Sequence, residues 1–435
     1  MRNRVLLAPG KGPLTTVDDY TRAGGYAALR KALADPQGPQ AVLDEISVAQ
    51  MRGRGGAGVL TAEKLKLVAR AAGDKYLICN AYDADDKSLI ASTLLEQNPH
   101  QIIEGMALAG LATGATEGYL YMRASRTAAE AAVKKALAEA LERGLLGRRI
   151  AGSRTEFSIT LVGVERGFMG GEESTMIEII SGRPMKAQQR PPYPTENGLN
   201  ERPTVVLNAE TLANFAAIVA QSGQAFAATG TRTSPGTKLF TVYGPGLSEG
   251  KVVEVPMGAP LQQALKAAGL DVNESTARAV VIGGKEGGVV PLSMLTIALD
   301  YDSLDAAGVI MGSSILEALP QNTCMVRWAM DQTTYLAGES CGKCIPCRTG
   351  VKRVAGTLEG ITSSLGASSD LDLLTEFSKY IPDGSLCGFG VHAVTPTVSA
   401  MKYFADDFST HLAGKCPTNT CAPVRAHRYA LKHVL

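Results

Sequence analysis

Short apolar runs alternate with helical patterns through the first half of the chain. Residues 101–112 form a helical pattern that follows Asn98-Pro99, a favourable helix start. Ser125 is expected to cap a long alanine-rich helix that ends near Gly144 or Gly147. Shorter apolar runs predict buried strands at Tyr76–Asn80, Gly118–Met122, Phe157–Val164 and Pro203–Leu207. This alternation predicts an α/β domain with a substantially parallel sheet over residues 1–235.

The second half of the chain changes pattern twice. Residues 226–236 are rich in Gly, Ser and Thr and are expected to be a linker. Strand, strand, helix and strand patterns then follow at Lys238–Tyr243, Lys251–Val255, Leu261–Ala268 and Ala279–Ile282. They predict a small α+β module over residues 236–320. From Asn322 the pattern is helical, which predicts a helical domain over 321–412 and a tail over 413–435.

Composition limits the kind of partner. The 435 residues carry a net charge of only +1, so there is no electrostatic reason to expect a nucleic acid. No apolar stretch approaches the roughly 18 residues that a membrane span needs, and the run Val5–Ala8 is too short for a signal peptide. We expect a cytoplasmic protein that does not insert into a membrane and reaches one, if at all, through partners.

Closely spaced cysteines give the strongest chemical signal. Cys341, Cys344 and Cys347 form a C-x2-C-x2-C run, and Cys387 follows within Ser-Leu-Cys-Gly-Phe-Gly. Three thiolates on one loop and a fourth from a distant segment match the ligand set of a [4Fe–4S] cluster. A structural zinc site is the alternative, although zinc more often takes two separated cysteine pairs or mixed Cys/His ligands.

A glycine-rich loop precedes a predicted helix at Arg52–Gly58, with Lys64 expected about two turns into that helix. Glycines let backbone N–H groups close on a phosphate, and the helix N-terminus adds a favourable dipole. Taken alone, such a loop is weak evidence, and a tight surface turn is the competing interpretation.

The motifs occur together in one order: RGRGGAG (52–58), GGEES (170–174), RPPYPTENGL (190–199), RPTVVLNAETLAN (202–214) and ESCGKCIPCRTG (339–350). With this set the chain resembles the NADH-oxidising flavoprotein subunit of respiratory complex I and its relatives in NAD-linked hydrogenases and formate dehydrogenases. The resemblance implies an α/β FMN-binding domain, a ubiquitin-like β-grasp module and a C-terminal helical iron–sulfur domain. It also implies a thioredoxin-like [2Fe–2S] partner subunit and a further iron–sulfur or catalytic subunit of hydrogenase, formate dehydrogenase or quinone-reductase type.

The resemblance also assigns roles to residues. Glu172, Glu173 and Asp85 are implied near the site where NAD(H) exchanges a hydride with FMN, and the cysteines named above are implied as ligands of the cluster that takes single electrons. The residues implied to bind FMN or the dinucleotide are Gly53, Arg54, Gly55, Gly56, Lys64, Asn80, Asp83, Tyr193 and Asn208.

Several positions depart from the family pattern. Val59 stands where the family has a phenylalanine that stacks on the dinucleotide, and Tyr82 stands where an aspartate is usual. Tyr193 replaces another phenylalanine and Arg190 a lysine, which preserves stacking and charge. Val59 and Tyr82 leave open an alternative function, an FMN and iron–sulfur relay or scaffold that has lost NAD(H) binding. A zinc-stabilised binding module is a third and weaker interpretation.

A second cysteine pair, Cys416 and Cys421, lies near the C-terminus with His411 and His427 close by in sequence. These side chains suggest a second metal site, for which zinc is the candidate ion, and the alternative is a pair of inert thiols. Cys79 and Cys324 lie in apolar runs and are expected to be buried packing residues.

Overall fold

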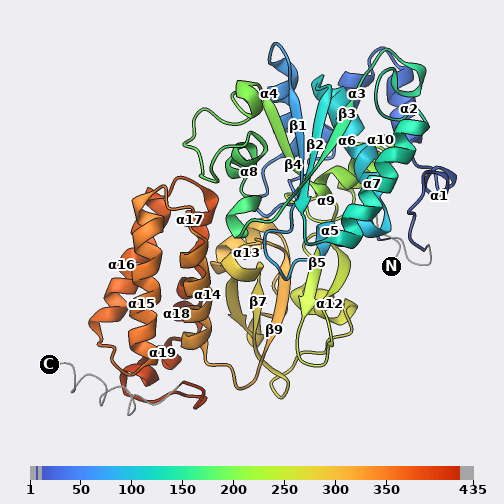
Figure 1. Ribbon diagram of the computed structural model, residues 1–435. Helices are drawn as coiled ribbons and strands as arrows, with labels where there is room; N and C mark the ends of the chain where they lie inside the picture. The colour runs from blue at the N-terminus through green and yellow to red at the C-terminus, as the bar shows by residue number, and fades with distance from the viewer. Residues whose placement is uncertain (1–5, 8–11, 422–435) are drawn as a thin grey trace.

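The computed structural model describes residues 6–7 and 12–421, and Figure 1 shows three regions joined along the chain. The first is an α/β region, the second contains a separate sheet, and the third is helical. Among the described residues, no helix is both long and apolar enough to cross a membrane.

The first region is built on a parallel sheet with the strand order β3-β2-β1-β4. Its strands are β1 (Tyr76–Ala81), β2 (Glu117–Arg123), β3 (Ser158–Val164) and β4 (Thr204–Asn208). All four predicted strands are therefore present, and the predicted parallel sheet is confirmed. In register, Leu77 of β1 lies between Gly118 of β2 and Val205 of β4.

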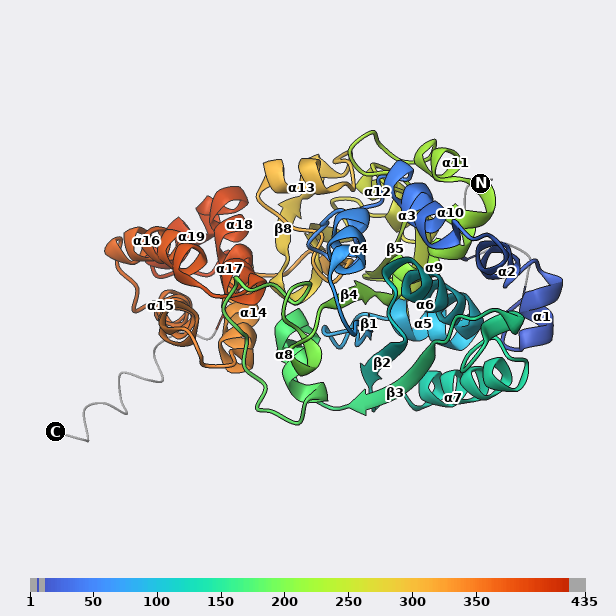
Figure 2. The same ribbon diagram turned by 90° about the horizontal axis from the view of Figure 1, so that it is seen from above.

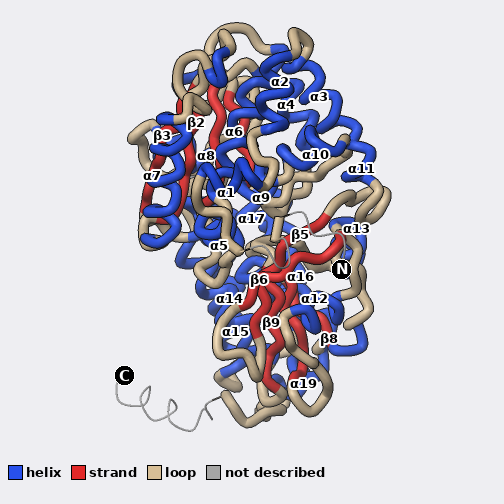
Figure 3. The backbone as a smooth tube through the Cα atoms, turned by 90° about the vertical axis from the view of Figure 1, so that its right-hand side faces the viewer, coloured by secondary structure: helices blue, strands red, loops and turns tan. Residues whose placement is uncertain are grey.

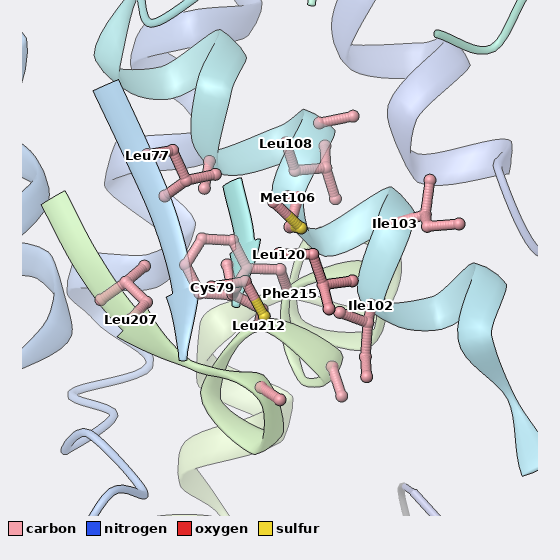
Figure 4. Packing of buried hydrophobic residues seen from close by; sticks show 14 of the residues in the cluster. Leu77, Cys79, Ile102, Ile103, Met106, Leu108, Leu120, Leu207, Leu212 and Phe215 are labelled. Carbon is pink, nitrogen blue, oxygen red and sulfur yellow. The ribbon is translucent and has the colours of Figure 1, made fainter. Parts of the chain in front are cut away.

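Side chains of β1 alternate between two cores, as the period of a strand requires. Leu77 and Cys79 point into the larger core against α6 and α9, which Figure 4 shows from close by. Ile78 points to the opposite face and packs with Met176 and Ile177 of α8. Both faces of the sheet are thus covered, which explains why the predicted strands read as continuous apolar runs.

Helices surround this sheet (Figures 1 and 2). The helix predicted at 101–112 is α6, and the alanine-rich helix is α7, which begins at Thr127, two residues after the expected Ser125 cap. The helices of this region are α1 (Val17–Arg22), α2 (Ala27–Ala34), α3 (Gly38–Val48), α4 (Thr61–Arg70), α5 (Ile90–Gln97), α6 (Pro99–Thr113), α7 (Thr127–Glu142), α8 (Glu173–Ile180), α9 (Ala209–Ala213), α10 (Phe215–Gln221) and α11 (Gly223–Ala227).

The second region contains a five-stranded mixed sheet with the order β6-β5-β9-β7-β8. The central pair β5 and β9 is parallel, whereas the other pairs are antiparallel. Figure 3 shows this sheet as a separate block beside the parallel one. Its elements are β5 (Thr237–Tyr243), β6 (Lys251–Pro256), α12 (Leu261–Ala267), β7 (Ala277–Ile282), β8 (Gly288–Pro291), α13 (Tyr301–Ala307) and β9 (Ile315–Pro320). Sequence patterns missed β8, which is only four residues long, and β9.

The third region is helical from Met325 onward and packs beside the second sheet in Figure 2. The long helices α14 and α15 lie against each other, and α18 contacts both α14 and β8. The helices of this region are α14 (Met325–Glu339), α15 (Val351–Thr362), α16 (Ser369–Gly384), α17 (Gly388–His392), α18 (Thr395–Tyr403) and α19 (Ala405–Leu412), with a π-helical turn at Pro346–Gly350 before α15.

Candidate functional site

A cavity of about 580 Å³ lies where all three regions meet. Asn80 at the end of β1 and Asn208 at the end of β4 line it. The chain winds outward in opposite directions from these two neighbouring strands, so their carboxyl ends form the crevice at which open α/β sheets bind ligands. The fold therefore places the cavity at the position where a nucleotide cofactor is expected.

The glycine loop forms one wall of this cavity and has no room for side chains. A Cβ on Gly56 would lie 2.7 Å from the carbonyl oxygen of Gly312, and one on Gly58 would lie 2.7 Å from the ring of Tyr301. A Cβ on Gly55 would lie 3.3 Å from that of Asn208. Gly56 also has φ +103°, which L-residues rarely adopt. The backbone of the loop therefore lines the cavity without side chains. Gly312 and Tyr301 of the second region pack against the loop.

A network of charged side chains crosses a second wall. Lys64 lies in the first turn of α4, not two turns in as expected, and its Nζ is 2.5 Å from Glu173 and 2.9 Å from the carbonyl oxygen of Val206. Arg190 contacts Glu172 at 2.8 Å and Glu173 at 3.2 Å. Glu172 in turn accepts the N–H groups of Ser174 and Thr175, both at 2.9 Å, and so caps α8. The predicted Lys64, Glu172 and Glu173 are therefore neighbours on one cavity wall.

A buried ion pair also lines the cavity. Lys238 of β5 pairs with Glu210 of α9, and both line the cavity. Burial lowers the pKa of Lys238 and raises the pKa of Glu210, and their mutual attraction opposes both shifts. Arg54, also buried, donates to the carbonyl oxygens of Arg52 at 3.0 Å and Pro235 at 2.6 Å. Arg54 forms no ion pair among the described residues, although its charge attracts Glu210.

These features fit FMN. The cavity combines a side-chain-free backbone cradle, a helix N-terminus at Thr61 and an unpaired buried cation at Arg54. Two buried polar atoms in the same lining, Arg54 Nε and Thr61 Oγ1, have no hydrogen-bond partner among the described residues. A phosphate monoester would satisfy such donors and the unpaired charge.

The four predicted cluster cysteines come together beside this cavity. Cys341, Cys344 and Cys347 lie between α14 and α15, and Cys387 directly precedes α17. A Cβ on Gly390 would lie 3.3 Å from that of Cys347, so the Cys387 loop packs against the three-cysteine loop. Burial raises the pKa of Cys347 to about 11 and that of Cys387 to about 12. Without a metal these thiols stay protonated, and the irons of a cluster would supply the positive charge that stabilises their thiolates.

Two residues predicted for the site lie away from the cavity. Asp85 is fully buried and lines a separate cavity of about 80 Å³, where its carboxylate accepts the N–H groups of Lys285 at 2.8 Å and Lys87 at 3.1 Å. Tyr193 is 53% exposed and absent from the cavity lining. Asp85 instead joins the parallel-sheet region to the second sheet, and its position does not support the predicted catalytic role.

Asp83 and Tyr82 also differ from expectation. Asp83 reaches the cavity lining, but its carboxylate accepts the N–H groups of Ala91 at 3.2 Å and Ser92 at 3.1 Å and so caps the start of α5. Tyr82 is fully buried, packs on Tyr121 with ring centroids 5.4 Å apart and accepts the N–H of Arg166 at 2.8 Å. Its ring therefore neither lines the cavity nor blocks it, whereas Val59 lies in the cavity lining and is 53% exposed.

Sequence reasoning missed several cavity residues that come from the second region. Lys238 and Glu286 are examples, together with the backbone at 309–314. Glu286 lies on a short turn at Gly284–Glu286, and among the described residues no hydrogen bond or ion pair reaches its carboxyl group. Burial raises its pKa to about 8, and the nearby Asp85 adds to the shift. The signal available in sequence for Glu286 was a Lys-Glu pair within an otherwise small and apolar stretch at 281–290.

The second cysteine group contains one residue more than the sequence predicted. Cys416, Cys421 and His411 come together as predicted, and Cys324 joins them. Cys324 is buried, as expected of a packing residue, and its Sγ also lies close to the donor atoms of these three side chains. His427 lies outside the described residues. Cys79, by contrast, is buried in the apolar core as expected, and burial raises the pKa of its thiol (Figure 4).

Comparison with known proteins agrees with this geometry. Residues 46–217 match the family model of the Nuo51 FMN-binding domain, and residues 327–411 match that of the NADH-ubiquinone oxidoreductase-F iron–sulfur binding region. The NADP-reducing hydrogenase subunit HndC of Solidesulfovibrio fructosivorans is 38% identical over 93% of this chain and 83% of its own length. The F 2 subunit of the NADH-quinone oxidoreductase of Rhizobium meliloti is 36% identical over 92% of this chain and 95% of its own length.

The chain belongs to this family of flavoproteins. A solved NAD+-reducing [NiFe]-hydrogenase in the H2-reduced state superposes with a TM-score of 0.78 at 28% identity, covering 93% of this chain and 68% of that one. The first family match contains the glycine loop, Lys64, both glutamates and Asn208, whereas the second contains all four clustered cysteines. The two matched stretches thus contain the four cysteines and the glycine-loop side of the cavity, while the rest of the lining at 238–314 lies between them.

Gly56→Ala is expected to lower FMN affinity about tenfold or more. A side chain at this φ costs about 1–3 kcal/mol, and its Cβ would also press on the Gly312 carbonyl. Fluorescence titration of the flavin-depleted protein measures the loss. Gly144→Ala is the matched control, because Gly144 has φ +62° with nothing within 4 Å of an added Cβ. Equal FMN affinity in Gly56→Ala and wild type would contradict the proposed cradle.

Glu286→Gln is expected to change how stability depends on pH. The carboxyl has a pKa near 8 in the folded chain and near its ordinary value when unfolded. The unfolded chain therefore releases this proton first, and Glu286 makes the protein less stable as pH rises from about 5 to 8. Urea unfolding at several pH values should show a shallower decline for Glu286→Gln. Asp305→Asn, at an exposed carboxyl of the same cavity, should keep the wild-type decline, and an unchanged slope in Glu286→Gln would refute the shift.

Proposed function

We propose that the chain is the flavin- and iron–sulfur-carrying subunit of an NAD(H)-linked oxidoreductase, passing a hydride between NAD(H) and FMN and single electrons between FMN and a [4Fe–4S] cluster. One observation carries the proposal. The cavity that contains the glycine loop is also lined by Gly388 and Phe389, which follow the cluster ligand Cys387 directly. A cofactor in this cavity and a cluster on these cysteines would be immediate neighbours.

Side chains of the cavity have distinct tasks in this proposal. The glycine loop and the N-terminus of α4 hold the phosphate, while Arg54, which forms no ion pair among the described residues, supplies positive charge. Lys64 and Arg190 are held in place by Glu173 and Glu172, which keeps two cations and two carboxylates ordered on one wall. When bound, FMN supplies the conversion between a two-electron hydride and single electrons. Hydride transfer itself needs no protein nucleophile or base.

We further propose the cellular setting and the subdivision of the chain. Residues 1–235 form the FMN and NAD(H) unit, 236–320 a β-grasp module, 321–412 the [4Fe–4S] unit and 413–435 a tail. The strand order of the second sheet, with a parallel central pair, supports the β-grasp assignment. The expected partners are a thioredoxin-like [2Fe–2S] subunit and a further iron–sulfur or catalytic subunit, in the cytoplasm. Two relatives, one named as part of a hydrogenase and one as part of a quinone oxidoreductase, support partners of these classes.

Cys344→Ala is expected to lose the cluster. Removing one of four thiolates leaves an iron site open, and iron should fall from about four atoms per chain toward zero. Iron and acid-labile sulfide analysis of anaerobically purified protein measures this, together with the EPR signal after dithionite reduction. Cys79→Ala, at a buried thiol of the apolar core, should retain its iron. Unchanged iron in Cys344→Ala would remove Cys344 from the ligand set.

NADH should bleach the flavin of the anaerobic holoprotein within the mixing time and then produce the reduced-cluster EPR signal. The relay without NAD(H) binding predicts the opposite, a flavin that accepts electrons from dithionite and ignores NADH. NADPH in a parallel titration tests the preferred dinucleotide, since one relative is named for NADP. Lack of response to both dinucleotides would reject the leading proposal in favour of the relay.

A further inference from the structure

Four possible metal ligands lie close together where the start of α14 meets the end of α19. Their donor atoms, the Sγ atoms of Cys324, Cys416 and Cys421 and a ring nitrogen of His411, all lie within 4.8 Å of one another. They come from three stretches of backbone. Cys324 directly precedes α14, His411 lies in the last turn of α19, and the other two cysteines lie on the loop that follows.

The separations among three of these four donor atoms fit one tetrahedral ion, and Cys416 Sγ lies within 4.8 Å of each of them. The Nε2 atom of His411 is 3.5 Å from Cys324 Sγ and 3.4 Å from Cys421 Sγ, and those two sulfur atoms are 3.6 Å apart. Zinc bonds of about 2.3 Å to sulfur and about 2.0 Å to nitrogen place tetrahedral ligand atoms about 3.5–3.8 Å apart. The same sulfur–sulfur distance is far too long for a disulfide.

The histidine is oriented to coordinate through Nε2. Its Nδ1 lies 2.7 Å from the carbonyl oxygen of Asp407, which fixes the proton on Nδ1 and leaves the Nε2 lone pair directed at the thiols. Both His411 and Cys324 are buried, whereas the two loop cysteines are half-buried. A hydrogen bond from the far ring nitrogen to a carbonyl oxygen is typical of metal-bound histidine and is not needed by an inert thiol cluster.

We propose that Cys324, His411, Cys416 and Cys421 bind one Zn²⁺ ion that fastens the C-terminal loop to the start of α14. Four protein ligands leave no open position, which is the arrangement of a structural zinc and not of a catalytic one. This site is separate from the proposed FMN and cluster sites and does not rest on them.

The surroundings explain what the ion would hold together. Asp407, one turn before His411, accepts the N–H of Met325 at 3.2 Å and pairs with Arg278 of β7 at 2.6 Å. The ion therefore sits at a junction between the second sheet, α14 and α19. Helix α14 has 15 residues and spans about 22 Å, with Cys324 before its first residue and the cluster loop after its last. Zinc has no redox chemistry, so its effect on electron transfer would be indirect, through the position of α14.

Metal analysis of the full-length protein tests the proposal. Protein purified anaerobically without chelators should contain about one zinc per chain besides its iron. Cys421→Ser and Cys324→Ser should each lose zinc and keep the iron and the cluster EPR signal, whereas Cys344→Ala should lose iron and keep zinc. Absence of zinc in the wild type, iron at this site, or zinc retained in Cys324→Ser would each overturn the assignment.

Two measurements on the wild type test the site even if the variants fail to fold. Exchange of the bound ion for Co²⁺ should give the visible absorption of tetrahedral cobalt with thiolate charge-transfer bands in the near ultraviolet. Removal of the ion should raise hydrogen exchange in residues 415–421 and at the first turn of α14, with exchange in the parallel sheet unchanged. Octahedral cobalt spectra, or exchange that is insensitive to removal of the ion, would refute the site.

Discussion

The close approach of bare backbone at the glycine loop is the constraint on which the cavity depends. Gly55, Gly56 and Gly58 face, in turn, the side chain of Asn208, the carbonyl of Gly312 and the ring of Tyr301. The hydroxyl of Tyr301 also donates to the carbonyl of Gly53 at 2.6 Å, and Arg52 pairs with Asp302 at 3.1 Å. The parallel sheet supplies the ligand-binding edge, but the second sheet region fixes the loop that closes it. The two regions therefore form one binding unit, in which most of the second sheet has its own core but Leu239 of β5 packs into the core of the first region.

Charge compensation inside this unit has two informative exceptions. Glu172, Glu173 and Glu210 each have a cation, and all three pairs lie in the cavity lining. Buried charges without such partners cost several kcal/mol. Among the described residues, Arg54 and Glu286 form no ion pair. Arg54 donates to two carbonyl oxygens and lies close to Tyr301 and Glu210, whereas burial raises the pKa of the Glu286 carboxyl. An unpaired cation beside a backbone cradle suits a phosphate, and a protonated carboxyl avoids adding a negative charge nearby.

Sequence alone predicted the parts of the site that are local in the chain. The glycine loop could be read because a glycine run determines its own backbone geometry, whereas Asn80 and Asn208 were implied by the family resemblance; all of them line the cavity. Asp85 lies away from the cavity because Asp83, at φ +47°, turns the chain after β1 so that Asp85 points toward the second sheet. Lys238, Glu286 and Cys324 were missed for a different reason. Each reaches its site through packing between regions, and no periodicity in the chain encodes that contact.

The departures from the family pattern carry unequal weight once the side chains are placed. Tyr82 is held in the smaller core by Tyr121 and by the backbone of Arg166, so its bulk does not enter the cavity. Arg190 lines the cavity but keeps the positive charge of the family's lysine, so Val59, half exposed in the same lining, is the departure there that removes an aromatic ring. An aromatic pair contributes about 0.5–1.5 kcal/mol beyond its buried area, about tenfold in affinity, and the smaller valine loses some apolar burial in addition. A loss of that size weakens a dinucleotide site whose charged wall is intact and does not abolish it. The substitutions therefore favour a site of reduced NAD(H) affinity over a relay that no longer binds the dinucleotide.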